Sequence, residues 1–276
     1  MAPAVRPIRR RLRTRGGFPR QPSGWVVGPP DFVGVGAQRA GTSWWYRLLC
    51  DHPTIQRVAV KEWHFFDPFH TRRFSAADVR SYHRHFPRPV GCLTGEWSPR
   101  YMHDFWTPAL LREAAPEAKI LVLLRDPLER YLSGRRHEVA ALKRTVVRHR
   151  RPYIDAMDAN DALDRSLYAR QLARLFQHFD PRQVLVLQYE RCVRAPAAEL
   201  RRTYDFLGVD APDHVPEFIG EPASRSHPRT EIAKPALEAA RRAILDDVAD
   251  LRALVPEVEV DLWSSCRPDE APPISA

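Results

Sequence analysis

A loop bracketed by Gly36 and Gly41 lies between an apolar run and a stretch of helical periodicity, and two hydroxyl residues, Thr42 and Ser43, close it. Proteins build phosphate cradles from an apolar strand that enters such a loop and is followed at once by a helix. The free N–H groups and the positive dipole end of the helix then face the anion. We therefore expect a helix to begin at Thr42. The backbone from Ala40 onward is expected to hold the phosphate.

The loop departs from the nucleoside-triphosphatase pattern, in which a lysine stands directly before the Ser/Thr. No lysine lies between Gly41 and Thr42, and the cation is instead Arg39, inside the loop. A kinase without that lysine loses its contact to the β/γ-phosphates, so the loop favours a 5′-phosphate that carries something other than a γ-phosphoryl group. A P-loop kinase or NTPase using ATP and Mg²⁺ is the alternative function. An ordinary strand-to-helix turn is the structural alternative.

A second anion site is predicted around Arg125, which directly follows an apolar run. Asp126, Pro127 and Glu129 have the spacing of an N-cap, an N1 proline and a capping box. Ser133 lies seven residues beyond Asp126, about two helical turns on, and so projects from the same face as the cap. Arg125 and Ser133 can thus converge on one anion. An ordinary ion pair at a strand end is the alternative for Arg125.

A third group of reactive side chains lies in the segment Lys61-Glu62-Trp63-His64-Phe65-Phe66-Asp67. We expect this segment to be extended, which would point the side chains of Glu62 and His64 the same way. A carboxylate beside a histidine can accept the proton of a hydroxyl group that attacks an electrophile. Lys61 is either a solvated lysine or a substrate contact.

These segments occur in the order of the landmarks of a known enzyme family. They are the loop at 36–44, the segment 61–67, Glu96-Trp97-Ser98-Pro99-Arg100-Tyr101 and the segment 119–133. Together they resemble the sulfotransferases that use 3′-phosphoadenosine-5′-phosphosulfate (PAPS), most of all the glycan-modifying branch typified by heparan sulfate sulfotransferases. Later segments at 166–168, 185–190, 205–209 and 260–263 are also similar, so the resemblance covers about residues 30–264.

The resemblance implies roles on the donor side. Thr42, Ser43 and the backbone before them would hold the 5′-phosphosulfate, while Arg125 and Ser133 would bind the 3′-phosphate. Arg39, where the family usually has lysine, would neutralise charge on the leaving phosphate, and it would do so without donating a proton. A late lysine-glycine-arginine loop of the glycan branch survives as Ser224-Arg225-Ser226-His227-Pro228, in which Arg225 is the expected cofactor contact.

The resemblance also implies roles on the acceptor side. Glu62 would be the general base, with His64 beside it in the catalytic group. Lys61 and Asp67 would contact the substrate. The expected reaction transfers a sulfuryl group to a hydroxyl, or less readily an amine, of a carbohydrate or small metabolite.

Charge is concentrated at the N-terminus. The net charge is +9, but residues 1–20 hold seven arginines and no acids, so the remainder has a net charge of 9 − 7 = +2. A nucleic-acid-binding protein is therefore disfavoured as a third function class. We expect residues 1–25 to form a disordered basic tail.

The sequence contains no run approaching the roughly 18 apolar residues of a membrane span, and no apolar region follows the N-terminal arginines. We therefore expect a cytoplasmic location. Cys50, Cys92, Cys192 and Cys266 are widely spaced, which favours reduced thiols over a single disulfide. We expect no metal cofactor, because the histidines and cysteines have no metal-ligand spacing.

Apolar runs at 32–35, 120–124 and 184–187 are expected to be buried parallel strands. Helical patterns occupy 43–50, 108–114, 128–142, 163–179, 196–206 and 236–254. This alternation predicts an α/β fold, a P-loop-like parallel sheet with helices on both faces, in a single domain at 26–265. We expect an unstructured tail at 266–276, and the sequence after Trp263 has no core pattern.

Overall fold

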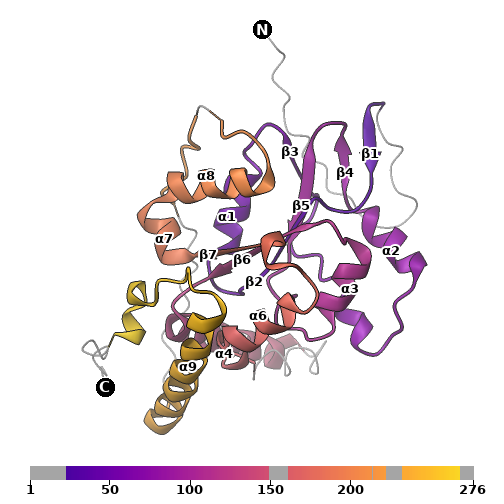
Figure 1. Ribbon diagram of the computed structural model, residues 1–276. Helices are drawn as coiled ribbons and strands as arrows, with labels where there is room; N and C mark the ends of the chain where they lie inside the picture. Colours follow the sequence, from indigo (N-terminus) through magenta and orange to yellow (C-terminus); the bar gives the residue numbers. More distant parts are fainter. Residues whose placement is uncertain (1–22, 149–160, 213, 222–231, 268–276) are drawn as a thin grey trace.

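A five-stranded parallel sheet forms the centre of the protein (Figure 1). The computed structural model describes residues 23–148, 161–212, 214–221 and 232–267. The strands lie in the order β3 (Ile55–Arg57), β5 (Leu93–Trp97), β2 (Phe32–Gly36), β6 (Lys119–Leu124) and β7 (Val184–Gln188). Because β2 is central, the loop at its carboxyl end has the ends of neighbouring strands on both sides.

The three predicted strands are confirmed as β2, β6 and β7. Every residue of β2 and β7 is buried, as expected for parallel strands covered on both faces. The strands β3 and β5 were not predicted. In β5 the polar residues Thr94 and Glu96 are buried within the sheet, so no continuous apolar run marks this strand in the sequence.

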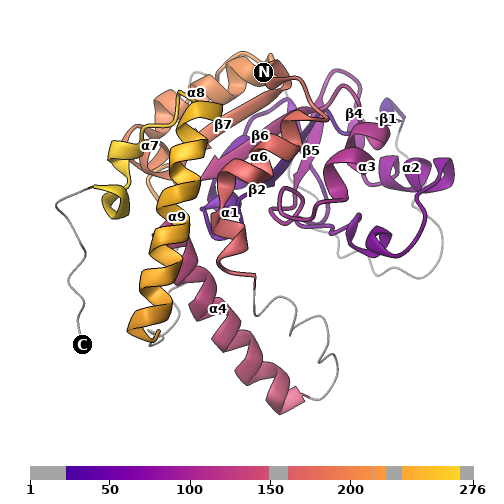
Figure 2. The same cartoon turned by 60° about the horizontal axis from the view of Figure 1, so that its bottom comes forward.

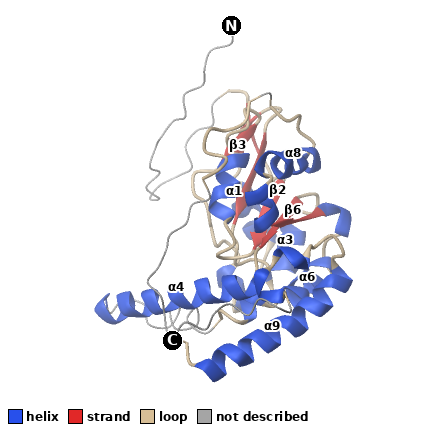
Figure 3. Ribbon diagram, turned by 90° about the vertical axis from the view of Figure 1, so that its left-hand side faces the viewer, coloured by secondary structure: helices blue, strands red, loops and turns tan. Residues whose placement is uncertain are grey.

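Helices cover both faces of the sheet, as predicted. The α-helices are α1 (Thr42–Leu49), α2 (Ala76–His83), α3 (Thr107–Ala114), α4 (Pro127–Arg148), α6 (Tyr168–Phe176), α7 (Tyr189–Arg194), α8 (Pro196–Leu207) and α9 (Lys234–Leu254). Figures 1 and 3 show α1 and α8 on one face, and α3, α4, α6 and α9 on the other. Figure 2 shows α4 and α9 projecting from the same side of the molecule.

The predicted helices are present with shifted ends. The largest difference lies at 163–179, where the short 3₁₀ helix η2 (Asp164–Ser166) precedes α6. Leu167, between the two, has a ψ of 87° and interrupts the helical backbone. The other 3₁₀ helices are η1 (Asp67–His70), η3 (Pro181–Gln183), η4 (Val260–Leu262) and η5 (Ser264–Cys266).

Near both ends of the chain, the structured region differs from the predicted domain boundaries. The strand β1 (Trp25–Val27) pairs antiparallel with β4 (Pro87–Pro89) and begins at the last residue assigned to the basic tail; residues 1–22 lie outside the described part. At the other end, η5 lies beyond Trp263, where the sequence has no core pattern. None of the helices in the described ranges is both long and apolar enough to cross a membrane. All four cysteines are free thiols.

Candidate active site

The loop after β2 enters α1 in the geometry of an anion cradle. The helix begins at Thr42, as predicted, and its N-cap is Gly41 with a φ of 88°. Glycine suits this left-handed conformation, and a Cβ here would lie 2.7 Å from the ring of Tyr189. The backbone N–H groups of Gly41, Thr42 and Ser43 have no acceptor among the described residues. These donors are therefore available to an anion.

Arg39 connects the cradle to helix α4. Its Nε donates to Ser133 Oγ at 3.2 Å. The sequence assigned these two residues to opposite phosphate groups of the cofactor, and the structure brings them into direct contact. The two predicted phosphate sites are thus adjacent at the carboxyl edge of the sheet.

Arg125 lies at the end of β6, half-buried. Its Nη2 is 3.4 Å from Glu129 Oε2, and its guanidinium carbon is 5.3 Å from the centre of the Tyr189 ring. The Arg125 carbonyl accepts a hydrogen bond from the Tyr168 hydroxyl at 2.9 Å. Tyr189 therefore lies against both Gly41 of the cradle and Arg125. The convergence of Arg125 and Ser133 on one anion stays a prediction.

Asp126 caps α4, and this part of the prediction is confirmed. Its Oδ1 accepts the N–H groups of Leu128 at 3.0 Å and of Glu129 at 3.2 Å. The predicted capping box is wrong in its partner: the Asp126 N–H donates to Glu190 Oε1 at 2.8 Å. Glu129 does not reach back, because its carboxylate pairs with Arg125.

The C-terminal segment donates hydrogen bonds to this cap, a role that the sequence did not predict. Ser265 donates to Asp126 twice, from its N–H at 3.0 Å and from its hydroxyl at 2.6 Å. Trp263 Nε1 donates to Glu190 Oε2 at 3.0 Å. The segment after Trp263 therefore packs on the domain although its sequence has no core pattern. The predicted tail also begins too early, because Cys266 packs against the core.

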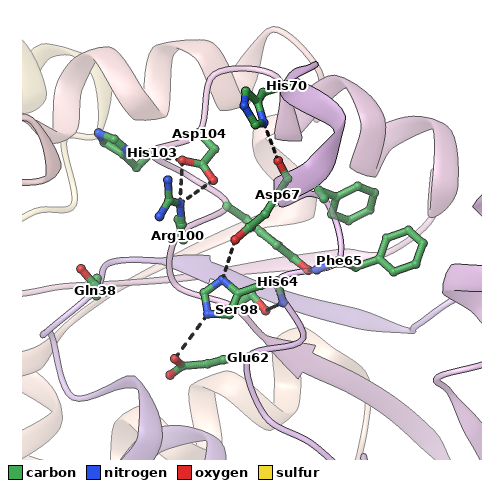
Figure 4. A network of polar contacts seen from close by, with 12 residues as sticks. Gln38, Glu62, His64, Phe65, Asp67, His70, Ser98, Arg100, His103 and Asp104 are labelled. Carbon is green, nitrogen blue, oxygen red and sulfur yellow. Dashed lines mark hydrogen bonds and ion pairs between the residues drawn. The ribbon is translucent and has the colours of Figure 1, made fainter. Parts of the chain in front are cut away.

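On the acceptor side, the imidazole of His64 lies between two carboxylates (Figure 4). Its Nε2 is 3.9 Å from Glu62 Oε2, and its Nδ1 is 3.4 Å from Asp67 Oδ2. The Nζ of Lys61 contacts Glu62 Oε1. Glu62 thus has a cationic partner on each side, and all four predicted acceptor-side residues lie in one cluster.

These contacts shift the protonation equilibria of the cluster. Asp67 and Glu62 raise the pKa of His64 to about 9, so its imidazole is positively charged at neutral pH. Burial acts to raise the pKa of Glu62, but the ion pairs with His64 and Lys61 outweigh it and lower that pKa to about 2. Burial lowers the pKa of Lys61, against the attraction of Glu62. Glu62 is therefore ionised at neutral pH.

The backbone of this segment is not extended, which corrects the prediction. Glu62 has a φ of 65° and His64 a φ of 52°, both in the left-handed region that non-glycine residues rarely adopt. The two side chains meet as predicted, but through these two left-handed residues and not through strand alternation. Such conformations persist only where surrounding contacts hold them.

Hydrogen bonds place the cluster at the same sheet edge as the cradle. The Ser98 N–H, just after β5, donates to the Gly34 carbonyl of β2 at 2.9 Å. The His64 N–H in turn reaches Ser98 Oγ at 3.5 Å. Figure 4 shows Gln38, from the cradle loop, in the same view as Glu62 and His64 and without a contact to them. The predicted donor and acceptor residues therefore surround one edge of the sheet.

Further arginines surround this edge, and the sequence analysis did not assign them a role. Arg165 contacts Gln38 Oε1 and pairs with Asp161 at 3.2 Å. Arg100, which belongs to the quoted segment 96–101, pairs with Asp104 at 2.9 Å. Arg165 thus contacts the cradle loop, and each of the two arginines is paired with a carboxylate.

The two remaining predictions concern Arg225 and metal binding. Arg225, the expected cofactor contact of the late loop, lies outside the described residues. For metals, the described ranges contain no group of three or more His, Cys, Asp or Glu side chains suited to bind an ion.

The sequence is similar to proteins of known class. The profile of the family described as "Sulfotransferase domain" matches residues 29–231. Heparan sulfate glucosamine 3-O-sulfotransferase 3B1 of Mus musculus is 30% identical over 195 residues, which cover 65% of this chain and 46% of that protein. The membrane-associated sulfotransferase kil1 of Dictyostelium discoideum is 31% identical over 119 residues, 42% of this chain and 24% of that protein. This chain therefore spans about half the length of the mouse relative.

Solved structures share the fold. A sulfotransferase from Alicyclobacillus acidocaldarius has a TM-score of 0.61 at 25% identity, covering 86% of this chain and 99% of that one. The sulfotransferase STF9 from Mycobacterium avium has a TM-score of 0.52 at 12% identity, covering 85% and 78%. The family profile matches most of the chain, and the chain belongs to the sulfotransferase domain family.

Proposed function

We propose that the protein transfers a sulfuryl group from PAPS to a hydroxyl group of a carbohydrate. Family membership, the anion cradle and the ionised Glu62 at the same sheet edge support this reaction. The family match favours it over the P-loop kinase alternative, as does the absence of a lysine between Gly41 and Thr42.

On the donor side, the N–H groups of the cradle and the hydroxyls of Thr42 and Ser43 hold the 5′-phosphosulfate. Arg39 stabilises the negative charge that develops on the leaving phosphate, by electrostatics alone because a guanidinium keeps its proton. Arg125 and Ser133 bind the 3′-phosphate through charge-assisted hydrogen bonds. The contact between Arg39 and Ser133 supports this arrangement, since it sets the two phosphate sites side by side.

On the acceptor side, Glu62 takes the proton of the attacking hydroxyl. The acceptor oxygen bonds to sulfur, the bond from sulfur to the bridging oxygen breaks, and 3′-phosphoadenosine 5′-phosphate (PAP) leaves. A carboxylate with a pKa of about 2 is a weak base. It suffices because the hydroxyl becomes strongly acidic as its oxygen bonds to the electrophilic sulfur. His64 and Lys61 keep Glu62 ionised and oriented.

One observation carries this proposal: an ionised carboxylate and a set of N–H groups without acceptors share one edge of the sheet. The cradle accounts for the binding of an anionic donor, and Glu62 accounts for the activation of a hydroxyl group. Neither feature alone distinguishes a transferase from a protein that only binds an anion.

A glycan acceptor is supported by the names of relatives. The mouse relative is named for heparan sulfate glucosamine as its substrate and for an oxygen as the sulfated atom. A small metabolite is the second acceptor class, and an amine is the less favoured nucleophile. The cytoplasmic location stays a prediction from the sequence.

The test is transfer from ³⁵S-labelled PAPS to three acceptors: N-sulfated heparosan, heparosan without sulfate, and a mixture of simple glycosides. Glu62→Gln serves as the matched control. Label on a polysaccharide hydroxyl, absent with the variant, is the expected result. Label only on glycosides would support the second acceptor class. No label on any acceptor, despite tight PAP binding, would reject the carbohydrate proposal, and phosphoryl transfer from ATP would support the kinase.

A further inference from the structure

We propose that Glu96, a fully buried carboxylate in β5, positions the loop that carries Glu62 and His64. It acts through the hydroxyl groups of Ser98 and Tyr101, and none of these three residues was assigned a role above. The inference rests on the proposed function of Glu62, and the experiment below separates the two.

Three side-chain hydroxyls donate to Glu96. Tyr82 and Tyr101 donate to Oε1 at 2.7 and 3.2 Å, and Ser98 donates to Oε2 at 2.6 Å. The backbone N–H of Trp63 also bonds to the carboxylate. Glu96 and the three hydroxyl residues are all completely buried, so no solvent competes for these bonds. Both carboxylate oxygens are therefore satisfied by protein donors.

Two of the hydroxyls extend this network to the loop. A hydroxyl group has one proton to donate, and its lone pairs accept. Because Ser98 and Tyr101 give their protons to Glu96, their lone pairs accept the N–H groups of His64 at 3.5 Å and of Phe65 at 3.0 Å. The consecutive N–H groups of 63–65 thus end on Glu96, directly or through one hydroxyl.

The loop needs such support because its backbone is strained. Glu62 and His64 both have left-handed φ values, which non-glycine residues adopt only when their surroundings enforce them. The distances from His64 to Glu62 and to Asp67 depend on this conformation. Anchored N–H groups between and after the two strained residues hold the imidazole between its carboxylates.

A purely structural role explains Glu96 less well. Burial raises its pKa, which shows that the site opposes the ionised form. No salt bridge to Glu96 occurs within the described ranges, and a buried carboxylate costs stability unless hydrogen-bond donors compensate it. An ionised Glu96 accepts the hydroxyl protons of Ser98 and Tyr101. The lone pairs of these two hydroxyls then remain free to accept the N–H groups of the loop.

Tyr82 and Tyr101 provide a matched pair of variants. Both are fully buried tyrosines that donate to Glu96 Oε1, but only Tyr101 also accepts a loop N–H. We compare Tyr101→Phe with Tyr82→Phe in the full chain by three measurements. These are PAP affinity by calorimetry, the titration of His64 by NMR with labelled histidine, and the turnover number for sulfuryl transfer to N-sulfated heparosan.

Both variants should lower the melting temperature to a similar extent and leave PAP affinity within about twofold of wild type. In Tyr101→Phe, the pKa of His64 should fall from about 9 toward its ordinary value of 6.5, because the imidazole moves away from its carboxylates. Turnover should fall about 10- to 100-fold, the effect of misplacing a reacting group by about 1 Å. In Tyr82→Phe, the titration and turnover should stay near wild type.

An unchanged His64 titration in Tyr101→Phe, or the same shift in both variants, would overturn the proposal. The titration does not depend on turnover, so a shifted His64 with normal turnover would support the positioning role and reject Glu62 as the base. If Tyr101→Phe does not fold, Ser98→Ala replaces it. It should shift the His64 titration in the same direction by a smaller amount, and no shift there would again overturn the proposal.

Discussion

At the start of α4, Asp126 is buried and accepts hydrogen bonds from neutral donors, whereas in the loop 61–67 the acids are half-exposed and face charged partners. Asp126 is not among the residues with a positive φ, and segments far apart in the chain enclose the helix cap. The loop has two left-handed residues and a positively charged imidazole between two carboxylates.

We interpret the cap at Asp126 as part of the ligand-binding region and the loop 61–67 as part of the reacting region. Arg125 directly precedes the cap and Ser133 lies on the helix that the cap begins, so we expect changes there to alter stability and nucleotide affinity. The loop keeps Glu62 ionised between Lys61 and His64, so changes there should alter turnover and pH dependence. Each prediction below tests one side of this division.

The largest effect is expected at Glu62. Glu62→Gln keeps the size and hydrogen-bonding capacity of the side chain but removes the base, so turnover should fall by about 10²–10⁴-fold. The measurement is the rate of ³⁵S transfer to N-sulfated heparosan at saturating PAPS.

The control for this variant is PAP affinity, which should stay close to wild type because Glu62 lies on the acceptor side. Turnover within a few-fold of wild type would reject the general-base role and make His64 the next candidate. Loss of nucleotide binding together with activity would instead show that Glu62 is structural.

The next effect is expected at Arg125. Arg125→Ala should weaken PAP binding by about 1.5–3 kcal/mol, the worth of a hydrogen bond to a charged group. The affinity for adenosine 5′-phosphate, which lacks the 3′-phosphate, should barely change. Calorimetric titration of both nucleotides measures the difference, and Ser133→Ala should act in the same direction. Equal weakening of both nucleotides would mean that Arg125 supports the fold and not the 3′-phosphate.

A smaller effect is expected at the cap itself. Ser265→Ala removes a hydroxyl donor from buried Asp126 at 2.6 Å, so the free energy of unfolding should fall by about 1 kcal/mol. Urea denaturation measures it, and Ser264→Ala is the matched control because its longer contact of 3.4 Å contributes less. If both variants are equally stable, the C-terminal segment does not hold the cap.

The smallest effect concerns pH. The pKa of His64 is raised from 6.5 to about 9, so its interactions stabilise the fold fully below pH 6.5 and are lost as the pH rises through 9. The stability difference between wild type and His64→Asn should therefore shrink over this range. We expect less than about 1 kcal/mol, since the ion pairs are partly solvated. A difference that grows with pH would contradict the charged imidazole.

Local spacing predicted the parts of the site that neighbouring residues build. The cap at Asp126, the start of α1 at Thr42 and the meeting of Glu62 with His64 all depend on residues within one turn or loop. The hydrogen-bond partners that are distant in the sequence were not predicted. Glu190 and Ser265 reach Asp126 across 64 and 139 residues, and no periodicity connects them.

The missed strand β5 has a related cause. Glu96 looks like a surface residue in the sequence, because a carboxylate inside a sheet is expected only where donors surround it. Those donors, Tyr82 and Tyr101, converge only in the folded protein. The left-handed residues Glu62 and His64 were missed for the same reason, since tertiary hydrogen bonds impose their conformation.

The contact between Ser265 and Asp126 also has a consequence for biosynthesis. A ribosome that adds about 5–20 residues per second needs roughly 7–28 s to make the 139 residues that separate the two. During that interval the nascent chain can pair β2 with β6, but the carboxylate at the head of α4 lacks its last donors. The Asp126 cap, beside the predicted nucleotide site, is therefore among the last parts of the protein to be completed, and a chain that ends before Ser264 would lack the two Ser265 donors.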